Sequence, residues 1–498
     1  MDILVVTAEL APYSRATSAG DAAAALPKAL RGLGHKVTVL SPLWASIDPA
    51  TRQLARRLVK IQVEVEGEKR AFPLFEGRSA GGVDLAFLAE ETLFSRSASP
   101  DDAEPETAVR WGAFARATIE LMKRRESLPD VVHCFGWQTA MLSVLMREDA
   151  ALAHIPVVLT LHDELSAGAE HGLYPRASLA AFGLSDAWWR IDGVEFYGKV
   201  SPLKGGIQTA ARITTPSPTS ARDATEQAGG LEGALRARSS ALTGILEGVD
   251  VSVWNAATDP WLESRFDAMD LAGSAAHGKQ RCKSAMQKEL GLPLRGDVPL
   301  IAAIGVASAE SGFEQLAEIG PRLLRNDVQV VIVTEPGSDP AIVSRFVQLA
   351  SRWSDRLAVR HDADQGQVHR TLGAADLVIV PRSGDAGGSR AMHAHRYGAV
   401  PIARRTGGIA DAVVDCDPRL GSGSGFLWDE PSADAMLAAI QRALAAFTQG
   451  AAFRALQHRV MTIDHSWDRS ARLYERLYRA ARAELARSEG STASEART

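Results

Sequence analysis

Short apolar segments alternate with helical patterns along this chain, and the alternation runs twice. The first series contains DILVVTA, KVTVLSP, PDVVHCFGW, HIPVVLTLH and ARITTPSP. The second series begins after residue 290 and contains VPLIAAIG, DVQVVIVTE, RLAVRHD, ADLVIVP and AVPIARR. Strands that are apolar throughout and separated by helices are typical of parallel sheets covered on both faces. The sequence therefore predicts the α/β class, with two doubly wound Rossmann-like domains that face a cleft.

A chain of 498 residues is also too long for one hydrophobic core, which favours two domains. The segment between the two series has mixed character and contains no clear strand, so we expect a hinge there. Near the C-terminus, the apolar residues of SWDRSARLYERLYRAARAEL recur at helical spacing, whereas SEGSTASEART has no apolar periodicity. The expected parts are an N-terminal domain (1–255), a hinge region (256–290), a C-terminal domain (291–465), a terminal helix that crosses back to the first domain (466–487) and a disordered tail (488–498).

Charge and composition argue against several classes of partner. The formal net charge is −5 and no basic block stands out, so we expect no nucleic-acid partner. No apolar run approaches the ~18 residues of a membrane span, and the first residues read as a strand rather than a signal peptide. The three cysteines lie far apart and have no metal-ligand spacing. We therefore expect a cytoplasmic protein that needs neither a metal nor a cofactor.

Several long motifs carry a resemblance to one family. They are EFYGKVSPLKGGIQTAARITTPSPTSARD (195–223), LTGILEGVDVSVWNAATD (242–259), GAVPIARRTGGIADAVVD (398–415) and SWDRSARLY (466–474). Together with the N-terminal strand, these stretches resemble the bacterial glycogen synthase and plant starch synthase family from the first residue to about residue 480. The resemblance implies the GT-B architecture, with an acceptor-side first domain of the starch synthase catalytic type and a second domain that binds the nucleotide-sugar.

The resemblance also implies an activity. Family members transfer glucose from ADP-glucose or UDP-glucose to the non-reducing end of an α-1,4-glucan, with retention of the anomeric configuration. The partners would then be a nucleotide-sugar and an α-glucan. The leaving group is a nucleoside diphosphate, so cationic side chains and N–H donors must stabilise the charge that develops on it.

In the first domain, five positions match residues of the family's site. Arg15 stands where the family has the lysine of its first loop, although Thr17 and Ser18 replace the two glycines that follow. A plain surface loop is an equal interpretation of this stretch. His162 matches the cleft histidine expected beside the transferred glucose, with a buried structural histidine as the alternative. The remaining matches are Asp21 on the donor side, and His133 and Trp137 on the acceptor side of the cleft.

In the second domain, uncharged residues occupy the positions at which the family has its diphosphate-binding Arg and Lys. Val306 stands in place of the arginine and Ser311 in place of the lysine. Each charge-assisted contact to a desolvated phosphate contributes ~1.5–3 kcal/mol. Losing two such contacts predicts at least an approximately hundredfold weaker stabilisation of the transition state.

The loop after ADLVIVP departs from the family pattern as well. Asp385 occupies the position of the family's essential glutamate and, with His162, is the expected catalytic residue. The other residues that the resemblance places at the donor are Gly387, Gly388, Thr406, Gly407 and Gly408. Gly407 and Gly408 have an alternative interpretation as simple turn formers.

Two hypotheses about function follow from this pattern. The first is an active glycogen- or starch-synthase-like glucosyltransferase, in which another cation such as Arg382 or Arg390 replaces those that are missing. The second is a catalytically impaired or inactive relative that binds glucan, or that associates with a true synthase and regulates it. The sequence leaves both open.

Overall fold

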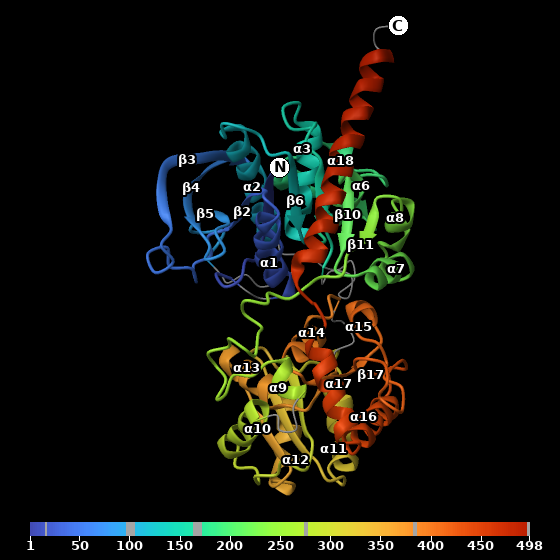
Figure 1. The fold of residues 1–498 in the computed structure, drawn as a ribbon. Helices are drawn as coiled ribbons and strands as arrows, with labels where there is room; N and C mark the ends of the chain where they lie inside the picture. The colour runs from blue at the N-terminus through green and yellow to red at the C-terminus, as the bar shows by residue number, and fades with distance from the viewer. Residues whose placement is uncertain (15–16, 96–104, 163–171, 273–276, 382–385, 496–498) are drawn as a thin grey trace. The chain divides into compact units, whose positions relative to one another are not determined.

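The computed structural model describes residues 1–14, 17–95, 105–162, 172–272, 277–381 and 386–495 (Figure 1). The chain forms two compact units. Residues 1–246 and 467–498 make up the first unit, and residues 247–466 make up the second. Among the described residues, no helix has both the length and the apolar character that crossing a bilayer requires.

The first unit is built on a nine-stranded sheet with the order β11-β10-β7-β6-β1-β2-β5-β4-β3. Neighbouring strands run parallel, except that β4 is antiparallel to both β3 and β5. The strands are β1 (Asp2–Thr7), β2 (Lys36–Pro42), β3 (Ala55–Val65), β4 (Glu68–Arg78), β5 (Asp84–Leu88), β6 (Val131–Phe135), β7 (Val157–Thr160), β10 (Arg212–Thr215) and β11 (Leu242–Gly244), and β8 (Glu195–Phe196) pairs separately with β9 (Lys199–Val200).

Helices connect these strands and cover the sheet. They are α1 (Ser18–Gly32), α2 (Pro105–Lys123), α3 (Trp137–Glu148), α5 (Leu179–Phe182), α6 (Pro202–Thr209), α7 (Pro218–Glu226), α8 (Glu232–Ala237) and α18 (Trp467–Glu495), with 3-10 turns at Arg176–Ser178 and Asp186–Trp188. The LKGGI motif lies in α6, which packs on α3. A Cβ on Gly206 would lie 2.8 Å from the Ala140 Cβ of α3, so the motif allows the two helices to approach closely.

The second unit is built on a six-stranded parallel sheet with the order β14-β13-β12-β15-β16-β17. The strands are β12 (Leu300–Gly305), β13 (Gln329–Thr334), β14 (Leu357–Arg360), β15 (Leu377–Val380), β16 (Val400–Arg404) and β17 (Phe426–Trp428). The helices are α9 (Ala268–Ala272), α10 (His277–Glu289), α11 (Phe313–Leu323), α12 (Pro340–Arg352), α13 (Gln365–Ala374), α14 (Ser389–Arg396), α15 (Gly407–Ala412), α16 (Ala433–Phe447) and α17 (Ala451–Met461). The predicted α/β class is confirmed, because each apolar segment of the two series forms a parallel strand.

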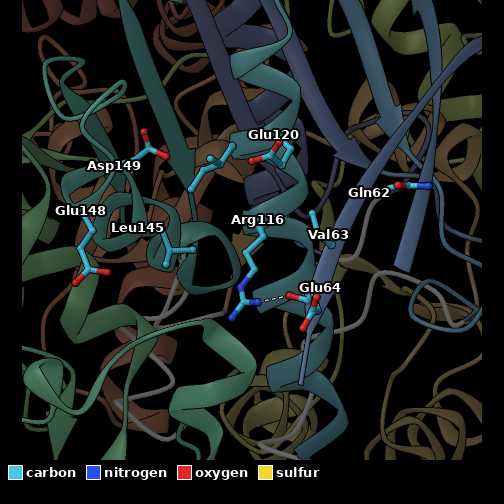
Figure 2. A pocket seen from close by; sticks show the side chains of 9 residues that line it. Gln62, Val63, Glu64, Arg116, Glu120, Leu145, Glu148 and Asp149 are labelled. Carbon is cyan, nitrogen blue, oxygen red and sulfur yellow. Dashed lines mark hydrogen bonds between the residues drawn. The ribbon is translucent and has the colours of Figure 1, made fainter. Parts of the chain in front are cut away.

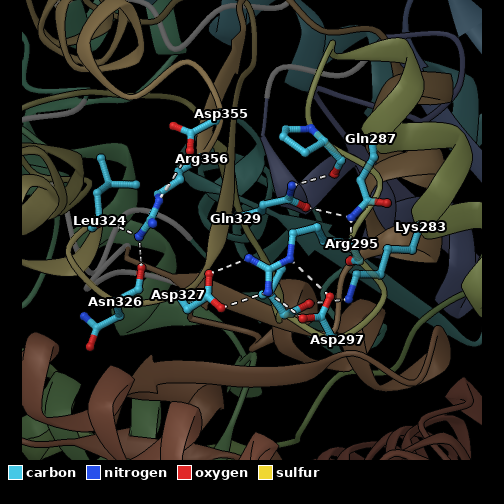
Figure 3. A network of polar contacts seen from close by, with 12 residues as sticks. Lys283, Gln287, Arg295, Asp297, Leu324, Asn326, Asp327, Gln329, Asp355 and Arg356 are labelled. Carbon is cyan, nitrogen blue, oxygen red and sulfur yellow. Dashed lines mark hydrogen bonds and ion pairs between the residues drawn. The ribbon is translucent and has the colours of Figure 1, made fainter.

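Residues 256–290, expected as a hinge, lie inside the second unit. Helix α10 packs on α13, and its Lys283 ammonium donates to the Asp376 carboxylate at 2.7 Å and to the Val298 carbonyl at 2.5 Å. Figure 3 shows the neighbouring amide contact, in which Gln287 Nε2 donates to Gln329 Oε1 at 2.7 Å. The chain passes from the first unit to the second at residues 246–247, earlier than the expected domain limit at 255.

The C-terminal helix α18 is part of the first unit, where it packs on α1. The side chains of Trp467, Tyr474 and Tyr478 lie in the core of that unit. The helix runs to Glu495, past residue 487, where a disordered tail was expected to begin. Strong helix formers predominate at 480–487, and because extending an existing helix costs less than starting one, the helix continues into the Ser- and Gly-containing residues 488–495.

Two buried histidines of the second unit form a chain of hydrogen bonds. His395 Nε2 lies 2.8 Å from the Ser424 carbonyl oxygen, and His395 Nδ1 lies 2.8 Å from His465 Nε2. Because a carbonyl only accepts, His395 Nε2 carries the proton and His465 donates to His395 Nδ1. Burial lowers the pKa of His395 to about 3 and the pKa of His465 to about 4.

This pair predicts that acid destabilises the second unit. An unfolded histidine takes up its proton near pH 6.5, whereas the folded pair stays neutral to about pH 4. The unfolded state thus binds more protons in this window, and the free energy of unfolding falls as the pH falls through it. In His465→Gln, the free energy of unfolding should therefore fall less than in wild type between about pH 7 and about pH 5, as measured by urea denaturation.

The matched control is His361→Gln, because 69% of the His361 side chain is exposed. This variant should keep the wild-type pH dependence. If the free energy of unfolding falls equally with pH in His465→Gln and in wild type, the buried histidine pair is not the cause of the acid destabilisation.

Candidate donor site

The carboxyl edge of the second sheet brings together the loops that the sequence motifs predicted for the donor. Strand β12 lies between β13 and β15, so the connections diverge on either side of it. Ligands of open parallel sheets bind at such a switch point, outside the carboxyl ends of the strands. The loops concerned follow β12, β13, β15 and β16.

The two glycine motifs are in direct backbone contact. Gly387 and Gly388 follow β15, and Gly407 and Gly408 follow β16, which is its parallel neighbour. A Cβ on Gly408 would lie 2.2 Å from the Gly387 carbonyl carbon, and a Cβ on Gly388 would lie 2.7 Å from the Gly408 carbonyl carbon. The Gly408 N–H donates to the Ala386 carbonyl at 2.9 Å. Glycine at these positions is required for the two loops to meet.

Both motifs lead into helices. Gly388 is the N-cap of α14 and has a positive φ of 70°, a conformation that favours glycine. Thr406 is the N-cap of α15 in extended conformation, and Gly407 has a φ of 48°. The first N–H groups of a helix have no intrahelical acceptor and favour an anion. The positive end of the α14 dipole therefore lies beside the contact between the two motifs.

The loop after β12 is neutral at both positions where the family has a cation. Val306 is 43% exposed, and Ser311 is buried. Ser311 Oγ donates to the Ser308 carbonyl at 2.6 Å and accepts from the Ser308 N–H at 2.7 Å, so its hydroxyl is used within its own turn. Gly312 then starts α11, and a Cβ there would lie 2.2 Å from the Pro381 carbonyl oxygen.

An arginine of α14 lies at this edge of the sheet. Arg390 Nη2 donates to Glu335 Oε2 at 2.9 Å, and the two side chains are 17% and 22% exposed. Glu335 directly follows β13, and its N–H donates to the Gly305 carbonyl at the end of β12 at 3.0 Å. The pair therefore holds a guanidinium beside the loop that lacks the expected cations. Sequence patterns singled out Arg390 but missed Glu335, whose position directly after an apolar strand is the available signal.

Three of the residues singled out by sequence lie outside the described residues. These are Arg15, Arg382 and Asp385. The structure therefore neither places Asp385 beside His162 nor places Arg15 at the start of α1.

The start of α1 is shaped by a buried carboxylate. Glu9 is 7% exposed, and its carboxylate accepts from the Thr17 N–H at 2.8 Å and from the Thr17 hydroxyl at 3.1 Å. Thr17 in turn caps α1, where its side chain accepts from the Ala19 N–H, and Asp21 lies in the first turn. The threonine that replaces a family glycine is thus an ordinary N-cap residue.

His162 lies two residues beyond the end of β7, at the carboxyl edge of the first sheet, and is 1% exposed. This edge also bears Glu9, which follows β1, and the N-cap Gly136, which follows β6. The structure thus places His162 at the strand-end position that the motif predicts.

His133 and Trp137, expected on the acceptor side of a cleft, are core residues. His133 Nδ1 lies 2.7 Å from the Tyr478 hydroxyl and His133 Nε2 lies 2.6 Å from the Thr160 hydroxyl, so both ring nitrogens are engaged. Burial lowers the pKa of His133 to about 3, which keeps the ring neutral. Trp137 is 2% exposed and packs edge-on against Trp111. The reason is that α18 and neighbouring aromatic rings cover these side chains.

A separate cavity of about 380 Å³ lies in the first unit (Figure 2). Arg116 of α2 crosses it, with one guanidinium nitrogen on the Glu64 carbonyl and another 3.1 Å from the Ala180 carbonyl. These contacts connect α2 to the edge strand β3, so Arg116 has a structural role. Among the described residues, no group of three or more His, Cys, Asp or Glu side chains has the geometry to hold a metal ion.

Comparisons with known proteins cover both units. The family model described as "Starch synthase catalytic domain" matches residues 2–237, and the model described as "Glycosyl transferases group 1" matches residues 288–447. The second match contains both glycine motifs and the Arg390–Glu335 pair.

Similar proteins extend over almost the whole chain. A glycogen synthase of Anaeromyxobacter sp. (strain Fw109-5) is 38% identical over 96% of this chain and 99% of its own. A protein named glycogen synthase 2 of Geobacter sulfurreducens is 32% identical over 97% of this chain and 99% of its own. A solved catalytic domain of starch synthase IV from Arabidopsis thaliana, bound to ADP and acarbose, superimposes with a TM-score of 0.87 at 29% identity, over 97% of this chain and 99% of that chain.

Proposed function

The chain belongs to the family of bacterial glycogen synthases and plant starch synthases, which are glucosyltransferases, and we propose that it transfers glucose from ADP-glucose to an α-1,4-glucan with retention of configuration. The choice of an adenine nucleotide is supported by the similar starch synthase IV, which was solved with ADP. The relatives give no support to the alternative of a non-catalytic chain. Association with another synthase and a cytoplasmic location stay predictions.

The observation that carries this proposal is the backbone contact of the two glycine motifs at the switch point of the second sheet. A diphosphate there lies at the N-terminal end of α14, where the helix dipole favours negative charge, and the absence of side chains at Gly387, Gly388 and Gly408 allows it to approach the backbone. Thr406 and Gly407 form the facing turn on the sugar side.

Arg390 is the cation that we assign to the donor diphosphate. Its planar guanidinium has five N–H donors, and such a fork can donate to phosphate oxygens while Nη2 also donates to Glu335. In a partly buried site such a contact stabilises the charge that develops on the leaving nucleoside diphosphate. Arg390 would thereby compensate in part for the neutral Val306 and Ser311.

The remaining roles rest on the family resemblance. His162 and Asp385 are proposed to flank the transferred glucose, where an imidazole and a carboxylate stabilise an oxocarbenium-like sugar. Arg15 and Asp21 are proposed to contact the donor from the first unit. We assign the buried His133 and Trp137 no direct contact with the acceptor.

Transfer of radiolabelled glucose from ADP-glucose to glycogen tests this function. We expect purified protein to incorporate label from ADP-glucose at least about tenfold faster than from UDP-glucose, a difference of ~1.4 kcal/mol between the two barriers. Asp385→Ala should abolish the incorporation. No incorporation by wild-type protein that still binds glycogen in a pull-down would instead establish the non-catalytic alternative.

A further inference from the structure

A groove of about 900 Å³ lies in the second unit, and none of the residues that line it belongs to the candidate donor site. Residues 260–263 form one wall, and α10 with Leu294 and Arg370 forms the rest. The volume lies within the ~300–1,000 Å³ typical of small-molecule sites.

The groove contains an exposed tryptophan that is held in place from behind. Trp261 is 50% exposed, and its backbone N–H donates to the carboxylate of the buried Asp259 at 2.8 Å. A Cβ on Gly366 of α13 would lie 2.7 Å from Trp261 Cε3, so the ring lies directly against the helix backbone. The indole is therefore a fixed aromatic platform with one side turned to solvent.

Charged side chains of both signs surround this platform. Arg281, Lys288 and Arg370 are cationic, and Glu263 and Glu289 are anionic. The carboxylate of Glu289 lies 3.6 Å from Arg370 Nε. Because carboxylates accompany the cations, the groove favours a neutral ligand rich in hydroxyl groups over a phosphate or a nucleic acid.

From these observations we propose that the groove binds a segment of α-glucan, with one glucose ring stacked on Trp261 and its hydroxyls on the surrounding charged groups. The C–H face of a pyranose is apolar and its edge is polar, which matches an exposed indole ringed by charged hydrogen-bonding groups. This inference rests on the proposed function, since the acceptor polymer supplies the ligand. Such a site holds one branch of the polymer while another reacts, which raises the effective concentration of chain ends.

Affinity electrophoresis of the full chain in gels that contain glycogen tests the proposal. Trp261→Ala should raise the dissociation constant for glycogen at least about fivefold, and Trp261→Phe should restore most of the affinity because it keeps an aromatic face. Gly366→Ala should weaken binding similarly, although alanine favours the helix, because its Cβ displaces the indole. Tyr197→Ala removes an exposed aromatic side chain that is not in the groove and should leave binding unchanged.

Enzyme assays separate this inference from the proposed function. In Trp261→Ala, the KM for glycogen should rise by the same factor, while the rate with maltotriose as acceptor stays within about twofold of wild type. If wild type transfers glucose to maltotriose and Trp261→Ala still binds glycogen normally, the groove proposal alone is wrong. If wild type transfers none, yet Trp261 governs glycogen binding, the proposed function alone is wrong. Weaker binding of ADP rather than glycogen in Trp261→Ala would mark a nucleotide site and overturn the proposal.

Discussion

Replacing Gly408 with alanine should lower kcat/KM for ADP-glucose by at least about a hundredfold. The new Cβ would lie 2.2 Å from the Gly387 carbonyl carbon and 2.5 Å from its oxygen, so the two glycine loops must separate. Both are backbone segments, and neither can rotate away as a flexible side chain would. A displacement of about 1 Å at a positioning loop is enough for a loss of this size.

Gly296→Ala is the matched control for this variant, because a Cβ at Gly296 meets no atom within 4 Å. Its activity should equal that of wild type. Calorimetric titration measures the affinity for ADP separately from folding. The melting temperature Tm of Gly408→Ala should fall by only a few degrees, because strain of about 1 kcal/mol shifts Tm by ~2–4 °C in units of this size. Activity of Gly408→Ala within about threefold of wild type would show that the loops are not the donor site.

Removal of the Arg390 guanidinium is the second change with a large expected effect. Arg390→Ala should lower kcat/KM for ADP-glucose by about 10–100-fold, the loss of one charge-assisted contact of ~1.5–3 kcal/mol. Arg390→Lys keeps the charge without the planar fork and should recover part of the rate. Steady-state kinetics with varied donor, together with inhibition by ADP, measures both effects.

Glu335→Gln distinguishes a phosphate ligand from a structural ion pair. Glutamine still offers Arg390 an oxygen acceptor but removes a negative charge from beside the diphosphate, so activity should stay within about threefold of wild type. If Arg390 serves only to hold Glu335, the two variants will lose activity or stability equally. Equal losses would exclude Arg390 as the missing cation.

Most of the fold is predictable from local sequence, because the buried strands are continuously apolar. The segments LIAAIG, QVVIVT and LVIV, for example, are buried throughout except for the terminal glycine of the first. The neutral character of Val306 and Ser311 is likewise readable without coordinates. What cannot be read is which side chains from distant segments meet.

His133 and Glu335 illustrate that limit. His133 appears at a strand end, as a ligand-binding histidine would, yet its ring is covered by Tyr478, which lies 345 residues later in the chain. Glu335 belongs to the site only because it binds Arg390, which lies 55 residues away in the chain. Neither partner follows from periodicity, because both contacts depend on how strands and helices are ordered across the sheet.

The place of α18 in the first unit has a consequence for how the chain matures on the ribosome. The second unit is complete once Ser466 has emerged, but the core of the first unit still lacks Trp467, Tyr474 and Tyr478. The half that is translated first is therefore finished last. Until α18 has been synthesised, the face of the first sheet that this helix covers is exposed to solvent. A nascent chain stalled near residue 466 therefore presents apolar surface to chaperones, although its second unit is already folded.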